Sequence, residues 1–175
     1  MSPAVSSSLE RLNALPAEAA RARLSACCGS REWARRLAAL RPFRRSEDLE
    51  EAADRIWWSL PREEWLEAFA AHPRIGSVAG KGSRQSRDWS RREQQGAVSA
   101  SPETLARLAD ANRAYEERFG YIFIVCATGK TATEMLALAQ KRLHNDARTE
   151  LRIAAEEQRR IMRVRLAKML DTEDS

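Results

Sequence analysis

Apolar side chains recur every three or four residues along most of the chain, as Trp33, Leu37 and Leu40 do. This spacing is typical of amphipathic helices that bury one face. Serine, threonine and proline residues at the starts of these stretches fit helix caps, and several stretches end before a glycine or a proline. After an initial turn that is closed by Pro16, we therefore expect helices over about 16–29, 30–41, 46–57, 61–69, 86–97, 101–119, 131–143 and 149–170.

Two stretches break this pattern. Three of the seven glycines fall between Gly76 and Gly82, which predicts a loop after His72-Pro73. Residues 121–126 are six apolar residues that are mostly β-branched or aromatic, and no second convincing strand is present to pair with them. The sequence therefore predicts an all-α fold: a single-domain bundle of seven to eight helices over residues 1–175, with one buried extended segment at about 121–127. Residues 1–8 and 171–175 are expected to be flexible tails.

Composition narrows the classes of protein that fit. A chain of 175 residues with 43% hydrophobic residues is long and apolar enough for one folded domain. The net charge of +5 admits a nucleic-acid-binding module, but acidic residues alternate with the arginines, as in Arg62-Glu63-Glu64. Such mixing is typical of solvated helix faces with ion pairs. We therefore expect no nucleic-acid partner and keep a basic helical binding module as the alternative.

The counts of cysteine and histidine exclude further classes. Two histidines and three cysteines do not supply the four closely spaced ligands of a structural zinc site, so no metal is expected. Cys27 and Cys28 are adjacent, which disfavours a disulfide between them and fits a reducing compartment. There is neither an apolar run of about 18 residues nor a signal peptide in Met1–Ala14. We expect a cytoplasmic protein without a membrane partner.

His72 is the first candidate for acid–base chemistry. The proline that follows it disfavours helical backbone at His72, so the imidazole lies at a break between a helix and a loop. An unperturbed imidazole titrates near ~6.5 and exchanges protons at neutral pH. The position alone is explained equally well if His72 is a surface histidine that follows a helix and has no catalytic role.

Three other features supply candidate binding groups. Ser90, Glu93 and Gln94 share one face if their segment is helical, although a solvated helix face explains that segment as well. Buried extended backbone at 121–127 leaves amide groups that need partners, and a ligand is one such partner. Arg165 lies at the apolar boundary of the last helix, where most arginines extend to solvent and a minority bind an anion.

Together these segments resemble one family, the decarboxylases of 2-oxo-4-hydroxy-4-carboxy-5-ureidoimidazoline (OHCU), over about Leu24 to Leu170. The order and approximate spacing of the segments agree with the family. The matching segments are Ala71-His72-Pro73-Arg74-Ile75-Gly76, Ser90-Arg91-Arg92-Glu93-Gln94, Tyr115 through Phe119-Gly120-Tyr121 to Ala127, Arg142-Leu143-His144-Asn145 with Glu150-Leu151, and Val164-Arg165-Leu166.

The resemblance implies an all-helical enzyme of urate degradation that needs no cofactor, is usually a homodimer, and forms (S)-allantoin and carbon dioxide. By motif match, His72 is the catalytic proton donor and Glu93 is the carboxylate that works beside it. The expected substrate-binding residues are Pro73, Ser90, Arg91, Arg92, Gln94, Phe123, Ile124, Val125, Cys126, Ala127 and Arg165. Thr128 stands where the family often has arginine.

The implied reaction suits these residue types. Loss of CO2 leaves electrons that the unsaturated ring delocalises, so the protein has to orient the carboxylate, stabilise the anion and deliver a proton to one face. One further alternative remains open at this stage, a related helical enzyme that acts on a different ureido acid. A scaffold or regulatory protein that has kept the fold without the activity would be expected to lack His72 or Glu93, and both are present.

Overall fold

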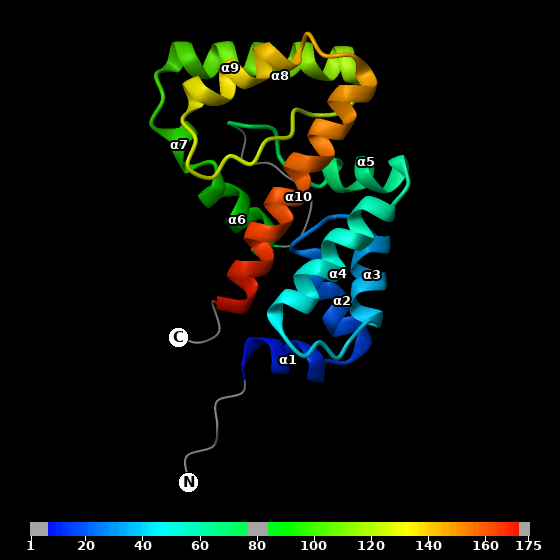
Figure 1. The fold of residues 1–175 in the computed structure, drawn as a ribbon. Coiled ribbons are helices and arrows are strands. Elements are labelled where there is room, and N and C mark those ends of the chain that lie inside the picture. Colours follow the sequence, from blue (N-terminus) through cyan, green and yellow to red (C-terminus); the bar gives the residue numbers. More distant parts are fainter. Residues whose placement is uncertain (1–6, 77–83, 172–175) are drawn as a thin grey trace.

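The structure is a computed structural model that describes residues 7–76 and 84–171. In these residues the chain forms helices and no strand, which confirms the expected all-α class (Figure 1). Of the expected tails, 1–6 and 172–175 lie outside the described residues, whereas Ser8 begins the first helix and Asp171 ends the last. The helices are α1 (Ser8–Ala14), α2 (Ala17–Ser25), α3 (Arg31–Ala39), α4 (Ser46–Ser59), α5 (Arg62–Ala70), α6 (Arg84–Glu93), α7 (Gln95–Val98), α8 (Pro102–Phe119), α9 (Ala132–Arg142) and α10 (Ala147–Asp171).

The expected count of seven to eight helices is wrong, because the described residues contain ten. The turn before Pro16 is a complete short helix, which Ser7 caps by accepting from the amide of Glu10. The polar stretch expected as one helix over 86–97 is divided at Gln94, where the backbone leaves the helical region. Gly96 lies so close to the turn before α9 that a Cβ there would overlap the carbonyl oxygen of Lys130. Of the expected glycine-rich loop, residues 77–83 lie outside the described part of the chain.

The caps of the two long helices around the extended segment follow the sequence signals. Ser101 accepts from the amide of Thr104 at the start of α8, directly before a proline at the first helical position. Gly120 ends α8 with a φ of 82°, a left-handed conformation that favours glycine. Thr131 and Glu134 form the expected capping box at the start of α9. These local signals fix where the extended segment begins and where it ends.

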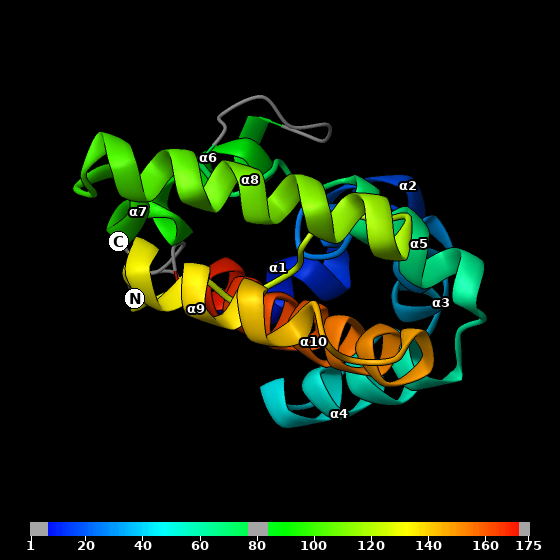
Figure 2. The same cartoon turned by 90° about the horizontal axis from the view of Figure 1, so that it is seen from above.

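The helices form two groups that α10 connects. Helices α8 and α9 lie side by side in both views, and Figure 1 shows them at one end of the molecule (Figures 1 and 2). At the other end α3 packs against α2 and α4, and α10 contacts α1, α4 and α5. The buried apolar side chains accordingly form one cluster around α1–α5 and α10 and a second cluster around α8 and α9. None of the described helices combines the length and the apolarity needed to cross a membrane.

The extended segment lies between the two apolar clusters. Successive side chains of extended backbone point to opposite sides. Ile124 and Cys126 accordingly join the first cluster, whereas Phe123, Val125 and Ala127 join the second. The segment is buried without pairing to another strand in the described chain, as the sequence predicts. It is therefore in contact with both halves of the molecule.

Side chains from the surrounding helices satisfy part of this buried backbone. Arg142 donates to the carbonyl oxygen of Ile124 at 2.7 Å, and Lys130 donates to that of Cys126 at 2.8 Å. Glu157 accepts from the amide of Cys126 at 2.9 Å. Since buried backbone groups need hydrogen-bond partners, these contacts allow a non-helical segment to cross the interior.

A buried ion pair holds Arg142 in place. Its Nε donates to Glu150, which is fully buried, at 2.7 Å, and its guanidinium lies 4.6 Å from the centre of the Phe123 ring. Tyr115 donates to the same carboxylate, and Asn145 donates to its other oxygen at 2.9 Å. Arg142, Asn145 and Glu150, which lie close together in the sequence, thus form a buried network that stabilises the extended segment through the contact of Arg142 with Ile124.

Candidate active site

Four segments that are far apart in the sequence meet around one small cavity. It is lined by the loop after α5, the end of α6, the extended segment and one residue of α10: His72, Pro73, Ile75, Ser90, Glu93, Gln94, Phe123, Ile124, Val125, Ala127 and Ile161. Its volume is about 20 Å³, which is room for about one water molecule. A ligand of several rings or branches therefore has to displace part of this lining when it binds.

His72 lies just beyond the end of α5, directly before Pro73. Its Nε2 is 2.7 Å from Oε1 of Gln158 in α10. A carbonyl oxygen only accepts, so in this arrangement Nε2 carries the ring proton. The pKa of His72 is lowered from 6.5 to about 3, mainly by burial and also by the positive charge of Arg165, whereas the contact with Gln158 opposes both effects. The imidazole is therefore neutral at pH 7.

This lowered pKa makes stability depend on pH in a defined direction. Between pH ~6.5 and the folded-state pKa of about 3, the unfolded chain binds a proton at His72 that the folded protein excludes. The free energy of unfolding should therefore fall as the pH is lowered through this window, by up to ~1.4 kcal/mol per pH unit from this one group. Urea unfolding at pH 7, 6, 5 and 4 measures this slope. His72→Asn should have a shallower slope than the wild type, and equal slopes would contradict the burial of a neutral imidazole.

Glu93 and Arg165 form a buried ion pair next to this histidine. Nε of Arg165 donates to Oε1 of Glu93 at 2.9 Å, and an Nη donates to Oε2 at 3.1 Å. Both side chains are more than nine-tenths buried. This two-pronged geometry fixes the position of the carboxylate as well as its charge partner.

The remaining donors of Arg165 are also used within the protein. They reach Oγ of Ser90 at 2.9 Å, Oγ of Ser86 at 3.1 Å and the carbonyl oxygen of Ala26 at 3.2 Å. A guanidinium has five N–H groups, and these contacts with the two to Glu93 account for five. Arg165 therefore lies beside the small cavity and holds the residues in its wall. Arg165 does not line the small cavity, but it lines a second cavity of about 180 Å³, and His72 borders both cavities.

Backbone amides form another part of the cavity wall. Phe123, Ile124, Val125 and Ala127 line it, and within the described residues their N–H groups make no hydrogen bond to the protein. Opposite them, Oε1 of Gln94 accepts from the amide of Gly76 at 2.9 Å, which joins the loop after His72 to the end of α6. The cavity thus combines an imidazole, a paired carboxylate, a hydroxyl and free amide donors.

Most of the residues singled out from the sequence meet here. Arg91 and Arg92 do not, because they are exposed on the outer face of α6, where Arg91 pairs with Asp88 at 3.0 Å. Cys126 does not line the cavity either; its side chain joins the first apolar cluster, and its amide donates to Glu157. The residues expected from the sequence that do line it are His72, Pro73, Ser90, Glu93, Gln94, Phe123, Ile124, Val125 and Ala127.

Sequence reasoning missed four residues around the cavity. Ile75 and Ile161 supply apolar walls, Ser86 contacts Arg165, and Gln158 contacts His72. A signal for Gln158 was present, because it lies on the same helical face as the buried Ala154 and Ile161. A polar residue on such an apolar face needs a buried partner.

A neutral imidazole, a buried carboxylate and free backbone amides around one cavity are the groups that acid–base enzymes use in their active sites. Together with the fold, they define an all-helical enzyme whose site lies on extended backbone between two helical groups. The sequence profile described as OHCU decarboxylase matches residues 13–167 of the chain. The chain belongs to the OHCU decarboxylase family.

Individual relatives agree with this assignment. The chain is 40% identical over 148 residues to the uric acid degradation bifunctional protein TTL of Arabidopsis thaliana, covering 82% of this chain and 45% of that protein. It is 31% identical over 127 residues to the 2-oxo-4-hydroxy-4-carboxy-5-ureidoimidazoline decarboxylase of Amia calva, covering 72% and 73%. The chain thus spans less than half of the Arabidopsis protein.

A solved structure has the same fold. The crystal structure of an OHCU decarboxylase in the presence of (S)-allantoin superposes with a TM-score of 0.75 at 36% identity, over 85% of this chain and 97% of that one. The family and the fold are therefore supported independently by sequence and by structure.

Proposed function

We propose that the protein is a carboxy-lyase that converts OHCU to (S)-allantoin and carbon dioxide in urate degradation, without a cofactor. The observation that carries the proposal is that, in a chain of this family, one cavity is surrounded by His72, by Glu93 in its pair with Arg165, and by the free amides of Phe123, Ile124, Val125 and Ala127. These groups supply the three things the reaction needs, which are a proton, a fixed charge pair and donors for an anion.

The reaction balances with one proton. The substrate carboxylate leaves as CO2, and the bonding electrons remain on the ring carbon, where the unsaturated ring delocalises them. The ring nitrogen and the neighbouring carbon that carries the ureido group each take up a proton, and the hydroxyl loses its proton and becomes the ring carbonyl of the product. One proton is therefore consumed in each turnover, and an enzyme that delivers it to one face makes one enantiomer.

His72 is the proposed source of that proton, at its Nδ1 atom. The imidazole is neutral, because its pKa is lowered to about 3. An anionic carboxylate that enters the cavity favours the charged imidazole and raises this pKa. Nδ1 then takes up a proton as substrate binds and gives it to the ureido-bearing carbon after CO2 has left. Positioned acids of this kind contribute ~10²–10⁴-fold to rates.

The other groups have supporting roles in this proposal. The free amides of the extended segment stabilise the negative charge that develops on the ring. Glu93 and Ser90, which Arg165 holds in place, accept and donate hydrogen bonds to the hydroxyl and ureido groups of the substrate. Arg165 acts through these two residues, and its charge also favours an anionic ligand nearby.

The release of CO2 from freshly generated OHCU tests this function. The purified protein should accelerate release above the spontaneous rate, with saturation as the substrate concentration increases. Release at the spontaneous rate with any amount of protein would reject the proposal. An acceleration with a different ureido acid but not with OHCU would favour the related enzyme.

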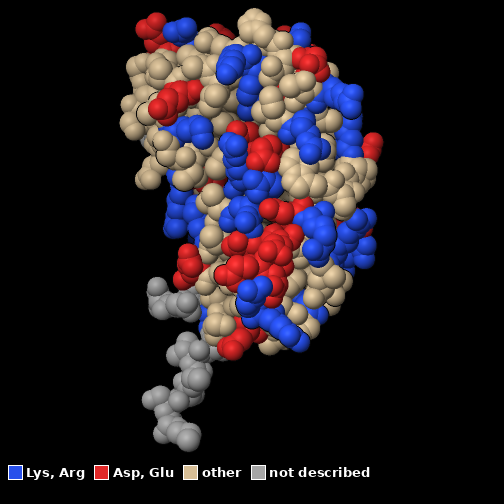
Figure 3. Space-filling model, in the orientation of Figure 1, with Lys and Arg blue, Asp and Glu red and all other residues tan. Residues whose placement is uncertain are grey.

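The alternative of a nucleic-acid-binding module has less support. On the face shown in Figure 3, acidic and basic side chains alternate, and a group of acidic side chains interrupts the basic ones. Many arginines lie in ion pairs, for example Arg35 and Arg36 with Glu32. A binding module would also give no role to the buried groups around His72.

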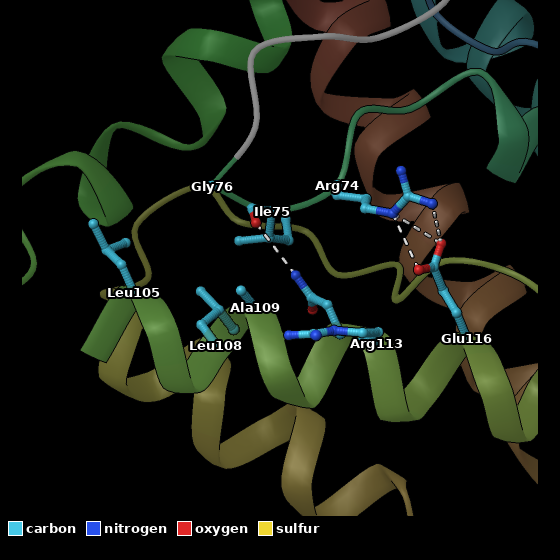
Figure 4. Close-up of a pocket in the computed structure, with 9 residues that line it drawn as sticks. Arg74, Ile75, Gly76, Leu105, Leu108, Ala109, Arg113 and Glu116 are labelled. Carbon is cyan, nitrogen blue, oxygen red and sulfur yellow. Dashed lines mark hydrogen bonds and ion pairs between the residues drawn. The ribbon is translucent and has the colours of Figure 1, made fainter. Parts of the chain in front are cut away.

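The proposal extends to a homodimer. A groove of about 460 Å³ lies between the loop after His72 and α8, with Leu105, Leu108 and Ala109 on its floor (Figure 4). Its rim carries both charges, since Arg74 pairs with Glu116 at 2.9 Å. A twofold interface brings the same patch of two copies together, and a patch with apolar groups and both charges suits such a contact, so we propose that a second copy of the chain binds here.

Light scattering on the purified protein tests this assembly. The wild type should have the mass of a dimer, and Ala109→Glu should have the mass of a monomer, because it places a charge on the apolar floor. Ala137→Glu, at an exposed alanine of α9 outside the groove, is the matched control and should stay dimeric. A monomeric wild type, or a dimeric Ala109→Glu, would contradict the proposed interface.

A cytoplasmic location completes the proposal. The three cysteines are free and buried, and burial raises the pKa of Cys27 and Cys28 to about 12. Both thiols therefore stay protonated at neutral pH and do not form disulfides readily. Free cysteines of this kind are typical of proteins in a reducing compartment.

A further inference from the structure

We propose that Gln158 is the residue that positions His72: its amide keeps the ring proton on Nε2 and so leaves Nδ1 as the atom that exchanges protons. The kinetic consequences of this proposal rest on the function proposed above. The structural part of the proposal, the tautomer of His72, does not depend on that function.

The contact between the two residues is short and mostly shielded from solvent, because Gln158 is fully buried and His72 is partly buried. Oε1 of Gln158 lies 2.7 Å from Nε2 of His72. The two residues are 86 positions apart, so the contact joins α10 to the loop after α5. Within the described residues, Nδ1 of His72 has no hydrogen-bond partner in the protein. The glutamine therefore determines which of the two ring nitrogens is protonated.

Core packing alone does not explain this glutamine. Its Nε2 is buried and, among the described residues, has no hydrogen-bond partner. An unsatisfied buried donor of this kind lowers stability by ~1–3 kcal/mol. On the same face of α10, the neighbouring buried residues Ala154 and Ile161 are apolar, and an apolar residue would fit their pattern better. A role in the site accounts for a polar residue that does not improve packing.

The choice of a neutral amide also suits the chemistry. A carboxylate in this place would favour the charged imidazole and raise its pKa before substrate arrives. The amide holds the ring in the same orientation and adds no charge. Proton uptake at Nδ1 is thereby reserved for the anionic substrate.

Nitrogen NMR of protein labelled with ¹⁵N-histidine tests the tautomer directly. The chain has only two histidines, His72 and His144, so His144→Gln assigns the signals. We expect His72 at pH 7 to be neutral, with Nε2 protonated and Nδ1 unprotonated. In Gln158→Met, a substitution of similar size, this preference should be lost. A wild type protonated at Nδ1, or an unchanged tautomer in Gln158→Met, would overturn the proposal.

Kinetics with OHCU test the positioning role. Gln158→Met should lower kcat by ~10²-fold with a smaller change in KM, as expected when a reacting group is misplaced by about 1 Å. Gln158→Glu should keep Nε2 protonated and move the pH profile of kcat/KM to higher pH, which a purely structural residue would not do. Gln140→Met, at an exposed glutamine of α9, is the matched control. Unchanged kcat and pH profiles in both Gln158 variants would overturn the proposal. A wild type inactive towards OHCU would instead reject the proposed function, and the NMR result would still decide the tautomer.

Discussion

Replacing His72 with asparagine is expected to reduce the decarboxylation of OHCU by ~10²–10⁴-fold while the protein stays folded. Asparagine keeps a polar group at the end of α5 but has no nitrogen that takes up and releases a proton. The loss should appear in kcat, because the proton is needed only after CO2 has left. Initial rates over a range of OHCU concentrations measure this effect, and circular dichroism in the far ultraviolet checks the fold.

The second histidine provides a control for this variant. His144 is exposed near the end of α9, away from the cavity lining, so His144→Asn should retain wild-type rates. Wild-type turnover by His72→Asn would remove His72 from the mechanism. An equal loss in both variants would indicate a general effect of the substitution.

Replacing Arg165 with methionine is expected to have the largest effect on stability. Methionine fills a similar volume but leaves the carboxylate of Glu93 buried and without its cation. Removing one partner of a buried ion pair typically lowers the free energy of unfolding by ~3–5 kcal/mol. Ser90 also loses its partner, so activity should fall at temperatures where the variant is still folded. Urea unfolding at pH 7 measures the change in stability.

Arg163 is a matched control on the same helix. It pairs with Glu50 at 2.8 Å, but about a third of its side chain is exposed. Partly exposed ion pairs contribute ~0–1 kcal/mol, so Arg163→Met should change the free energy of unfolding far less than Arg165→Met. Similar losses of unfolding free energy in the two variants would contradict the larger contribution that we assign to the buried Arg165–Glu93 pair.

Local sequence signals predicted the fold well where they act on neighbouring residues. The capping serine before Pro102, the left-handed Gly120 and the Thr131–Glu134 box all form as expected, because each depends on contacts within a few residues. The division between α6 and α7 could not be predicted. Close to the break, Gly96 of α7 approaches the carbonyl group of Lys130, and local signals do not reveal a contact between residues more than 30 positions apart.

The same distinction applies to the site. His72 and Glu93 stand out because a proline and a helical spacing mark them locally. The role of Arg165 as a support for Glu93 does not follow from its place in α10, since their contact joins residues 72 positions apart. Arg91 and Arg92 lie beside Ser90 and Glu93 in the sequence, but helical geometry turns them outward. Which neighbours face the cavity is decided by the packing of α6 against α10.

The handedness of the product is the most direct test of the central claim that His72 delivers a proton to one face of the substrate. Freshly generated OHCU is mixed with the protein, and circular dichroism follows the allantoin as it forms. The proposed function requires an optically active signal of (S)-allantoin that appears faster with more protein and is lost in His72→Asn. Racemic allantoin that forms at the uncatalysed rate would contradict it.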